Sequence, residues 1–190
     1  NLAFKLPQGK WQIVEKYSYA YQGLTVMGKD LVLLDGNQIK GVFSISDVDT
    51  GGWRIGLLNQ LIYSWEFQNR YDGCYKRHEY YLVKVKRKGS ALNCLVVRHI
   101  DWQRFMYQPD DPERKTAMAM WKHFIKSNKL KPPKVMLYSR HAFYAPSFGN
   151  KYIVIIYVDN PELYGASKNK FTTEETSEYH PANINQYPDK

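Results

Sequence analysis

Three consecutive polar residues, Ser139, Arg140 and His141, have the side chains that a catalytic site would need. Residues two apart in a strand share a face, so Ser139 and His141 could meet as nucleophile and base. Arg140 would then point the other way, where it could bind a carboxylate or phosphate through two hydrogen bonds. No Gly-x-Ser-x-Gly motif surrounds the serine. A small hydrolase or transferase is therefore a secondary hypothesis, and an ordinary strand end with a hydrogen-bonded histidine is the alternative.

His99 and Asp101 form a second such pair, again two residues apart at an expected strand end. They could act as a histidine–carboxylate pair or as two metal ligands. A metal site needs a third protein ligand, and neither an HExxH motif nor another suitable spacing supplies one. We therefore expect no metal and no cofactor, and we favour a structural hydrogen bond at this pair.

Residues 46–52, with the sequence SDVDTGG, are expected to form a polar loop ahead of Trp53. Two carboxylates followed by two glycines resemble half of a cation-binding loop, but the later oxygen ligands of an EF-hand are missing. The glycines do not match a phosphate-binding motif either. The alternative is a capped turn between a strand and a helix.

Positive charge is unevenly distributed along the 190-residue chain, which holds 27 Lys+Arg against 18 Asp+Glu. Residues 61–140 carry a net charge of +10, whereas residues 1–60 carry +1 and residues 141–190 carry −2. Two clusters dominate: Lys84, Lys86, Arg87 and Lys88 in a hairpin, and Lys122, Lys126 and Lys129 at a helix end. Such clusters suit an anionic partner. Their alternatives are protection of a sheet edge and complementation of a helix dipole.

Aromatic residues make up 15% of the chain. We expect most of them to pack in the core, because tyrosine buries its ring and keeps its hydroxyl near water. Trp53, Trp102 and Tyr144 lie in irregular segments or at strand ends and are the candidates for exposed ligand contacts. Basic residues interleaved with tyrosines also suit single-stranded nucleic acid, although no RRM, KH or helix-turn-helix pattern is present.

The first half of the chain reads as antiparallel strands joined by polar turns. An Asp-Gly-Asn sequence at residues 35–37 is the clearest hairpin turn, and residues 28–30 are expected to form another turn. Apolar residues at helical spacing then predict a helix over residues 56–69. The expected strands are residues 11–17, 24–27, 31–34 and 39–45.

In the second half we expect a basic hairpin at residues 78–88 and 91–100, and then a helix. Pro112 suits its first turn, Asp110 or Asp111 its cap, and the prolines at 132–133 its end. Its buried stripe would be Ala117, Trp121, Phe124 and Ile125. Two more strands are expected at residues 135–143 and 152–158. This pattern predicts one α+β domain over residues 1–160, with a mainly antiparallel sheet and two packed helices. Residues 161–190 would form a polar tail or surface-wrapping segment.

The two cysteines, Cys74 and Cys94, are too few for a disulfide scaffold. If the hairpin strand extended back through Cys74, the two would lie roughly 33 Å apart, so the sequence favours free thiols over a bond. No apolar run reaches the roughly 18–20 residues of a transmembrane helix. The chain begins at Asn1, and we take this to favour a periplasmic or secreted protein, with a cytoplasmic location as the alternative.

The hypothesis that these features support best is an exported binding or accessory protein that is not an enzyme. It would dock an anionic surface through residues 61–140, with a glycan, a lipid head group or an acidic protein as partner. It could also be a subunit of a larger assembly. Single-stranded nucleic acid is a less favoured partner.

Overall fold

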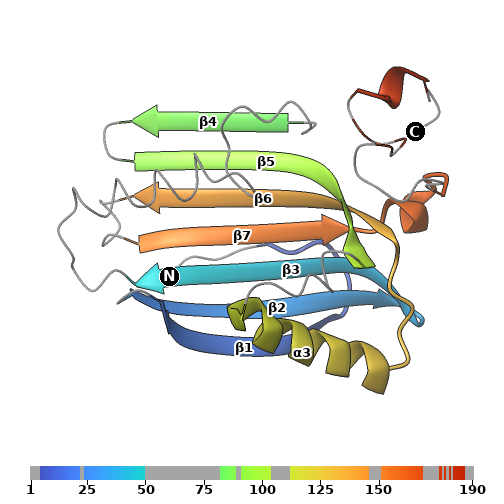
Figure 1. Cartoon of the computed structure of the whole chain (residues 1–190), viewed down its shortest axis with the longest axis horizontal. Helices are drawn as coiled ribbons and strands as arrows, with labels where there is room; N and C mark the ends of the chain where they lie inside the picture. Colours follow the sequence, from blue (N-terminus) through green and yellow to red (C-terminus); the bar gives the residue numbers. More distant parts are fainter. Residues whose placement is uncertain are drawn as a thin grey trace.

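In the described part of the chain, seven antiparallel strands form one sheet in the order β1-β2-β3-β7-β6-β5-β4 (Figure 1). The computed structural model describes residues 5–21, 24–49, 82–88, 91–103, 112–145, 151–168, 176, 178, 180 and 182–186. The strands are β1 (Trp11–Tyr21), β2 (Leu24–Asp35), β3 (Gln38–Asp49), β4 (Leu82–Lys88), β5 (Ala91–Asp101), β6 (Val135–Ala145) and β7 (Lys151–Asp159). The last strand in sequence, β7, lies at the centre of the sheet between β3 and β6.

The meander β1–β3 contains the turn expected at residues 35–37. Asp35 pairs with Gln38, and Gly36 has a left-handed φ of 59°, which glycine adopts at no steric cost. The turn expected at residues 28–30 is wrong, because β2 runs unbroken through Gly28. The Tyr17 ring of β1 lies over Gly28, so closely that an added Cβ would overlap it. Glycine is needed at this position because it leaves room for the Tyr17 ring, and it does not reverse the chain.

The loop expected from residue 46 is also wrong over its first part. Residues 46–49 continue β3, and Asp47 pairs with Met27 on one side and Ile153 on the other. A strand flanked on both sides keeps its backbone extended, which prevents these residues from wrapping around a cation. Residues 50–52 and Trp53 lie outside the described residues.

The predicted basic hairpin is confirmed as β4 and β5, with Lys88 opposite Ala91. The two later strands are confirmed as β6 and β7. Their pairing begins with Leu137 opposite Asp159 and ends with Ala145 opposite Lys151. Because β7 pairs with both β3 and β6, it joins the meander β1–β3 to the group β4–β6.

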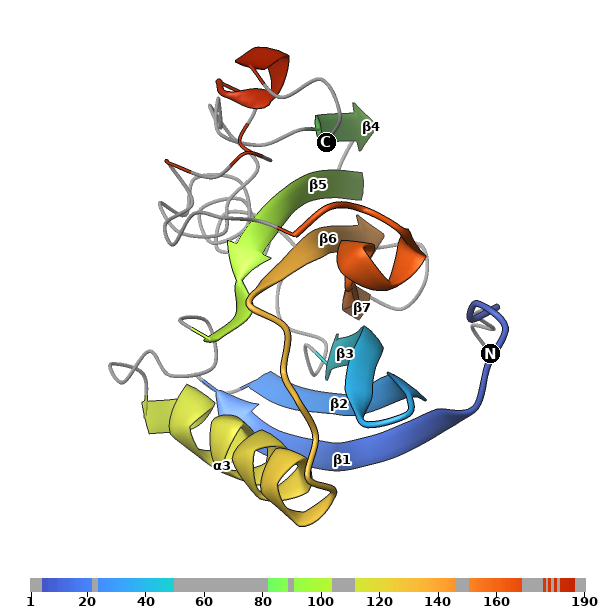
Figure 2. The same ribbon diagram turned by 90° about the vertical axis from the view of Figure 1, so that its right-hand side faces the viewer.

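The helix α3 (Pro112–Ser127) lies across one face of the sheet at the β1 and β2 edge (Figure 2). We call this the helix face and the other the opposite face. Side chains alternate between the faces, and those of Val32, Val42 and Val158 pack with Trp121 of α3 in the main core. Trp121 is 2% exposed, while Phe124 and Ile125 pack against the same cluster.

The fold is therefore mostly antiparallel sheet with one described helix and short 3-10 turns. The prediction of two packed helices is not confirmed, since the helix expected over residues 56–69 lies outside the described residues.

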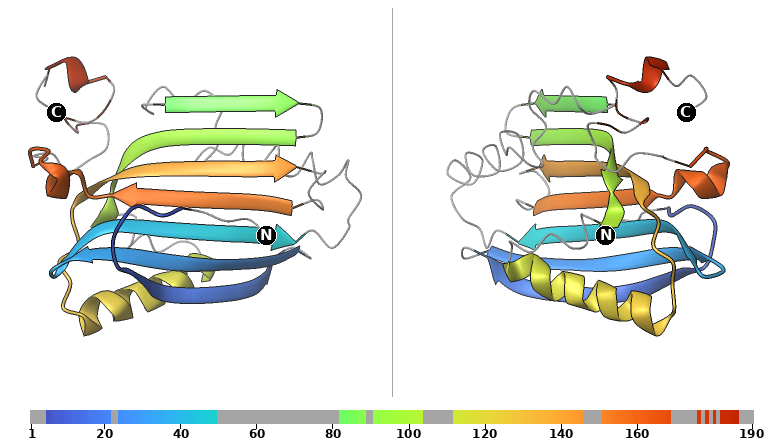
Figure 3. Two further views of the ribbon diagram at one scale, coloured as in Figure 1. Left: turned by 180° about the vertical axis from the view of Figure 1, so that it is seen from behind. Right: turned by 45° about the vertical axis from the view of Figure 1, so that its right-hand side comes forward.

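Two 3-10 turns, η3 (Pro161–Tyr164) and η4 (Ile184–Gln186), lie in the C-terminal segment (Figure 3). Glu178 of this segment is only 1% exposed, and the His180 ring meets His99 of β5 edge-on, with centroids 6.3 Å apart. Part of the segment therefore packs against the sheet. A domain boundary at residue 160 stays a prediction.

Cys94 is completely buried on β5 and forms a disulfide bond. The only other cysteine in the chain is Cys74, which lies outside the described residues. The expectation of free thiols is therefore wrong. It assumed a strand extending back through Cys74, and that stretch lies outside the described residues.

Candidate functional site

The predicted nucleophile and base, Ser139 and His141, share the opposite face of β6 but do not bond each other. The Ser139 hydroxyl donates to the backbone oxygen of Tyr157 at 3.0 Å, and Nε2 of His141 lies 2.8 Å from Oδ1 of Asn93. Burial lowers the pKa of His141, so the ring is neutral at pH 7 and donates Nε2–H to that amide oxygen. Both side chains therefore bond residues of neighbouring strands, and they do not form a nucleophile–base pair.

Arg140 lies on the helix face, as its place in the strand predicts, and is buried. Its Nη2 lies 3.4 Å from the Tyr152 hydroxyl. The sheet therefore separates its guanidinium from Ser139 and His141.

His99 is buried on β5, with His180 packed edge-on against its ring, and Asp101 is the last residue of the same strand. Within the described ranges, no three His, Cys, Asp or Glu side chains are grouped so as to hold a metal ion.

The two basic clusters lie at opposite edges of the sheet. Residues 84–88 belong to β4, one edge strand, whereas α3 contacts β1, the other edge strand (Figure 1). Lys122, Lys126 and Lys129 are all exposed near the C-terminal end of α3. The tertiary structure does not combine the two clusters into one patch.

Trp102, expected to be exposed, is 3% exposed and belongs to the core. Its backbone N–H donates to Lys134 O at 2.8 Å, and its ring meets Trp121 edge-on with centroids 5.9 Å apart. The expectation is wrong because the Trp102 ring, which directly follows β5, packs against Trp121 of α3. Tyr144 pairs within β6, and its side chain lies outside the described residues, as does Trp53.

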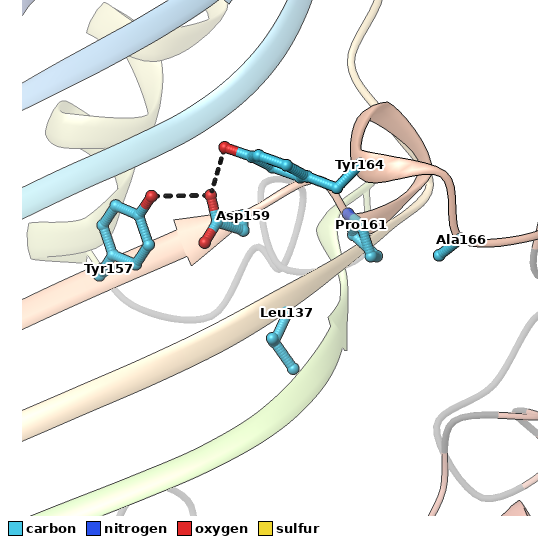
Figure 4. Close-up of a pocket in the computed structure, with 6 residues that line it drawn as sticks. All are labelled: Leu137, Tyr157, Asp159, Pro161, Tyr164 and Ala166. Carbon is cyan, nitrogen blue, oxygen red and sulfur yellow. Dashed lines mark hydrogen bonds between the residues drawn. The ribbon is translucent and has the colours of Figure 1, made fainter. Parts of the chain in front are cut away.

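An open pocket of about 450 Å³ lies on the opposite face at the ends of β6 and β7 (Figure 4). Among the described residues, two tyrosines and one carboxyl group provide its side-chain polar atoms. Its lining residues are Leu137, Tyr157, Asp159, Pro161, Tyr164 and Ala166. Its volume lies within the roughly 300–1,000 Å³ that is usual for small-molecule sites.

Asp159 is held in place by both tyrosines. Its Oδ1 accepts from the Tyr157 hydroxyl at 2.8 Å and from the Tyr164 hydroxyl at 3.4 Å (Figure 4). Burial raises the pKa of Asp159, while the two hydroxyls and Lys40 act in the opposite direction. Burial and the bond to Asp159 raise the pKa of Tyr157, so this phenol stays protonated at neutral pH.

The short turn η3 positions Tyr164 because Asn160 ties it to β3. Asn160 is 3% exposed, and its backbone N–H donates to Lys40 O at 2.9 Å. Its Oδ1 accepts from the Glu162 N–H at 3.2 Å and so caps the turn, while Pro161 suits its start. Asn160 and Pro161 thus support the pocket by holding η3 against β3.

Three further residues border this group. The Trp11 and Tyr157 rings lie with centroids 6.4 Å apart, and the Lys40 ammonium lies 4.8 Å from the centre of the Tyr164 ring. Gly41 of β3 leaves the space between Trp11 and Asp159 open: an added Cβ would lie 3.4 Å and 3.5 Å from them.

Sequence reasoning did not single out any residue of this pocket. The only available signal was the alternation of Tyr157 and Asp159 before Asn160-Pro161, which equally describes an ordinary strand end. The pocket is formed by residues of β6, β7 and η3, which lie apart in the sequence, so no local motif predicts it.

A second polar group lies on the helix face between β1, β2 and α3. Glu15 is opposite Asp30, and Trp121 Nε1 donates to Asp30 Oδ2 at 2.8 Å. Burial and the neighbouring Asp30 raise the pKa of Glu15 to about 7, and burial raises that of Asp30. Burial and Asp30 likewise raise the pKa of Tyr17 to about 12. The Glu15 carboxyl, 7% exposed, is therefore half protonated near neutral pH.

This raised pKa predicts that stability falls with rising pH. The folded chain holds the Glu15 proton up to pH of about 7, whereas an unfolded chain releases it near 4.5. Glu15 therefore favours the folded state fully below pH of about 4.5, and this contribution is lost as the pH rises to about 7, at a cost of about 2–3 kcal/mol. In urea unfolding, the free energy of unfolding of Glu15→Gln relative to that of the wild type should increase by that amount between pH 5 and pH 8. Glu162→Gln is the control, and parallel profiles for Glu15→Gln and wild type would contradict the assignment.

In the part of the chain that the structure describes, no helix is both long enough and apolar enough to cross a membrane. No protein-family model, curated protein or solved structure matches this chain.

Proposed function

We propose that this chain is a non-catalytic binding protein whose ligand occupies the pocket of Tyr157, Asp159 and Tyr164. One observation carries the proposal: two tyrosine hydroxyls orient a partly buried carboxyl group in a pocket that is otherwise apolar. A few placed polar groups among apolar and aromatic walls are typical of small-molecule sites. The proposal includes export, which the Cys94 disulfide supports because disulfides persist in oxidising compartments.

The hydrolase or transferase alternative has weaker support. A nucleophile must be within hydrogen-bond reach of its base, and Ser139 and His141 bond Tyr157 O and Asn93 instead. Asp159 faces two protonated phenols, and neither is a nucleophile at neutral pH.

Docking of an anionic partner is a separate proposal. Because the two basic clusters lie at opposite edges of the sheet, it concerns either cluster alone. The second cluster is its better support because Lys122 and Lys126 of α3 and Lys129, which lies just after the helix, are all exposed. Three cations alone are a modest attraction that salt screens. A single-stranded nucleic acid would need aromatic rings beside these cations, and the tryptophan of this helix, Trp121, is buried.

Blocking the pocket tests the binding proposal. Ala166 lines it and lies two residues after Tyr164, the last residue of η3, so Ala166→Phe should fill the space without entering the core. Saturation-transfer NMR with a fragment set of sugars, amino acids, nucleosides and organic amines should find binders of the wild type. We expect these to bind Ala166→Phe at least about tenfold more weakly, since a filled pocket excludes them sterically.

Met27→Gln is the matched control, because Met27 is 44% exposed on β2, the strand next to β1, and does not line the pocket. It should bind every fragment as the wild type does. A fragment set that binds wild type and Ala166→Phe equally, or binds neither, would remove the proposal.

A further inference from the structure

We infer that the ligand of this pocket is a neutral carbohydrate, with one sugar ring seated between Tyr164, Tyr157 and the Asp159 carboxylate. The inference rests on the proposed binding function and names its ligand class. Three features of the pocket carry it: its charge balance, its pattern of hydrogen-bond acceptors and its apolar walls.

The charge of the pocket is balanced by its own residues. Asp159 brings one negative charge, and Lys40 acts on it as a nearby positive charge. The Lys40 ammonium already covers the Tyr164 ring, which is the position that a cationic ligand would take. A cation would have to displace Lys40, and an anion would face the Asp159 carboxylate. A ligand without net charge meets neither cost.

Among the described residues, the bonded side chains of Asp159, Tyr157 and Tyr164 offer acceptors to a ligand, and the Lys40 ammonium is the nearby donor. Both tyrosine hydroxyls donate their hydrogens to Asp159 Oδ1. Their oxygens can therefore still accept hydrogen bonds from a ligand. Within the described part of the chain no hydrogen bond reaches the other oxygen, Oδ2, which Figure 4 shows apart from both hydroxyls. The ligand must therefore bring donors, and sugar hydroxyls are donors without charge.

The remaining walls suit the C–H face of a sugar ring. Leu137, Pro161 and Ala166 are apolar, and Leu137 and Tyr164 are 39% and 56% exposed. Exposed apolar side chains beside a fixed carboxylate suit a ligand that is apolar on one face and hydroxyl-bearing at its rim. Because the pocket is open, we expect it to hold one unit of a longer glycan.

The test uses the full chain and a panel of neutral trisaccharides: cellotriose, maltotriose, mannotriose, xylotriose and N-acetylated chitotriose. Trigalacturonate, deacetylated chitotriose and trialanine represent anions, cations and peptides. Trp11 is the optical reporter because its ring lies beside Tyr157. We expect at least one neutral trisaccharide to change its fluorescence, and Trp11→Phe should abolish that signal while binding persists in calorimetry.

Four variants test the contribution of each proposed contact to sugar binding. Asp159→Asn should weaken the neutral sugar about tenfold, because it removes a charged acceptor. Tyr164→Ala should weaken it about fivefold through the lost ring, and Tyr164→Phe less than that. Lys40→Met should raise the affinity for deacetylated chitotriose about fivefold relative to that for the neutral sugar, because Asp159 is then unbalanced. A merely structural role for Lys40 would change both ligands alike.

Each remaining outcome overturns the inference. Stronger binding of trigalacturonate, deacetylated chitotriose or trialanine than of any neutral trisaccharide would assign the pocket to that other class. Binding of a neutral sugar that Asp159→Asn and Tyr164→Ala leave unchanged would place it elsewhere. No binding from the panel, with fragments still sensitive to Ala166→Phe, would reject the carbohydrate alone. Insensitive fragments would reject the binding function as well.

Discussion

Replacing Trp121 by alanine should lower the free energy of unfolding by about 3–5 kcal/mol, the usual cost of deleting a buried tryptophan. The side chain is 2% exposed and meets Trp102 and Phe124 edge-on, with centroids 5.9 Å and 6.3 Å away. It belongs to the same buried cluster as Val32 of β2. Urea unfolding followed by far-UV circular dichroism measures the change.

Trp121→Phe separates packing from hydrogen bonding. It keeps an aromatic ring in the core but removes the N–H that Asp30 Oδ2 accepts at 2.8 Å. The loss leaves a buried carboxyl oxygen without this donor, and we expect a cost of about 1–3 kcal/mol. Met120→Ala on the exposed side of α3 should cost much less, since Met120 is 47% exposed. Equal effects of Trp121→Ala and Met120→Ala would mean that α3 does not dock through this ring.

Reducing the disulfide of Cys94 should destabilise the chain by about 2–5 kcal/mol. Cys94 is completely buried on β5, so its bond ties the interior of the sheet to a segment outside the described strands. Cys74 is the only other cysteine of the chain, and a bond between the two closes a loop of about 20 residues. A loop of that length corresponds to roughly 3 kcal/mol of lost chain entropy in the unfolded state. Thermal unfolding with and without a reductant, beside thiol counting by mass spectrometry, measures this.

Cysteine variants supply the control. Cys74→Ser should lose as much stability as the reduced wild type and should no longer respond to reductant. Adding Cys94→Ala should then cost only the packing of the second side chain, because the shared bond is already gone. A wild type that unfolds at the same temperature with and without reductant would refute the stabilising bond.

Local patterns predicted most of the described elements. Apolar alternation and the Asp35-Gly36-Asn37 turn located the hairpin of β2 and β3. Both signals depend only on residues that are close together in the sequence. Pro112 marked the start of the helix, and α3 begins there. Gly28 misled in β2, since glycine often marks a turn, and only the Tyr17 ring lying over it explains its place in a strand.

The candidate site could not be read in the same way. The pairs chosen for chemistry, Ser139 with His141 and His99 with Asp101, follow from strand spacing, but spacing does not determine which partner a side chain bonds. In the fold, Ser139 turns to a backbone oxygen of β7 and His141 to an asparagine of β5. Trp102 was expected at the surface because its segment is irregular, yet irregular backbone can still place a ring in the core.

The sequence by itself determined that this chain forms an antiparallel sheet with a covering helix and that its positive charge lies in residues 61–140. Those properties depend on composition and short-range periodicity. Strand order was decided only in the tertiary structure, because pairing joins distant segments. By placing β7 between β3 and β6, it brought Asp159 beside Gly41 and Leu137 and moved the two basic clusters to opposite edges. Charge that is adjacent in sequence thus became separated in space, while residues from separate elements formed the pocket.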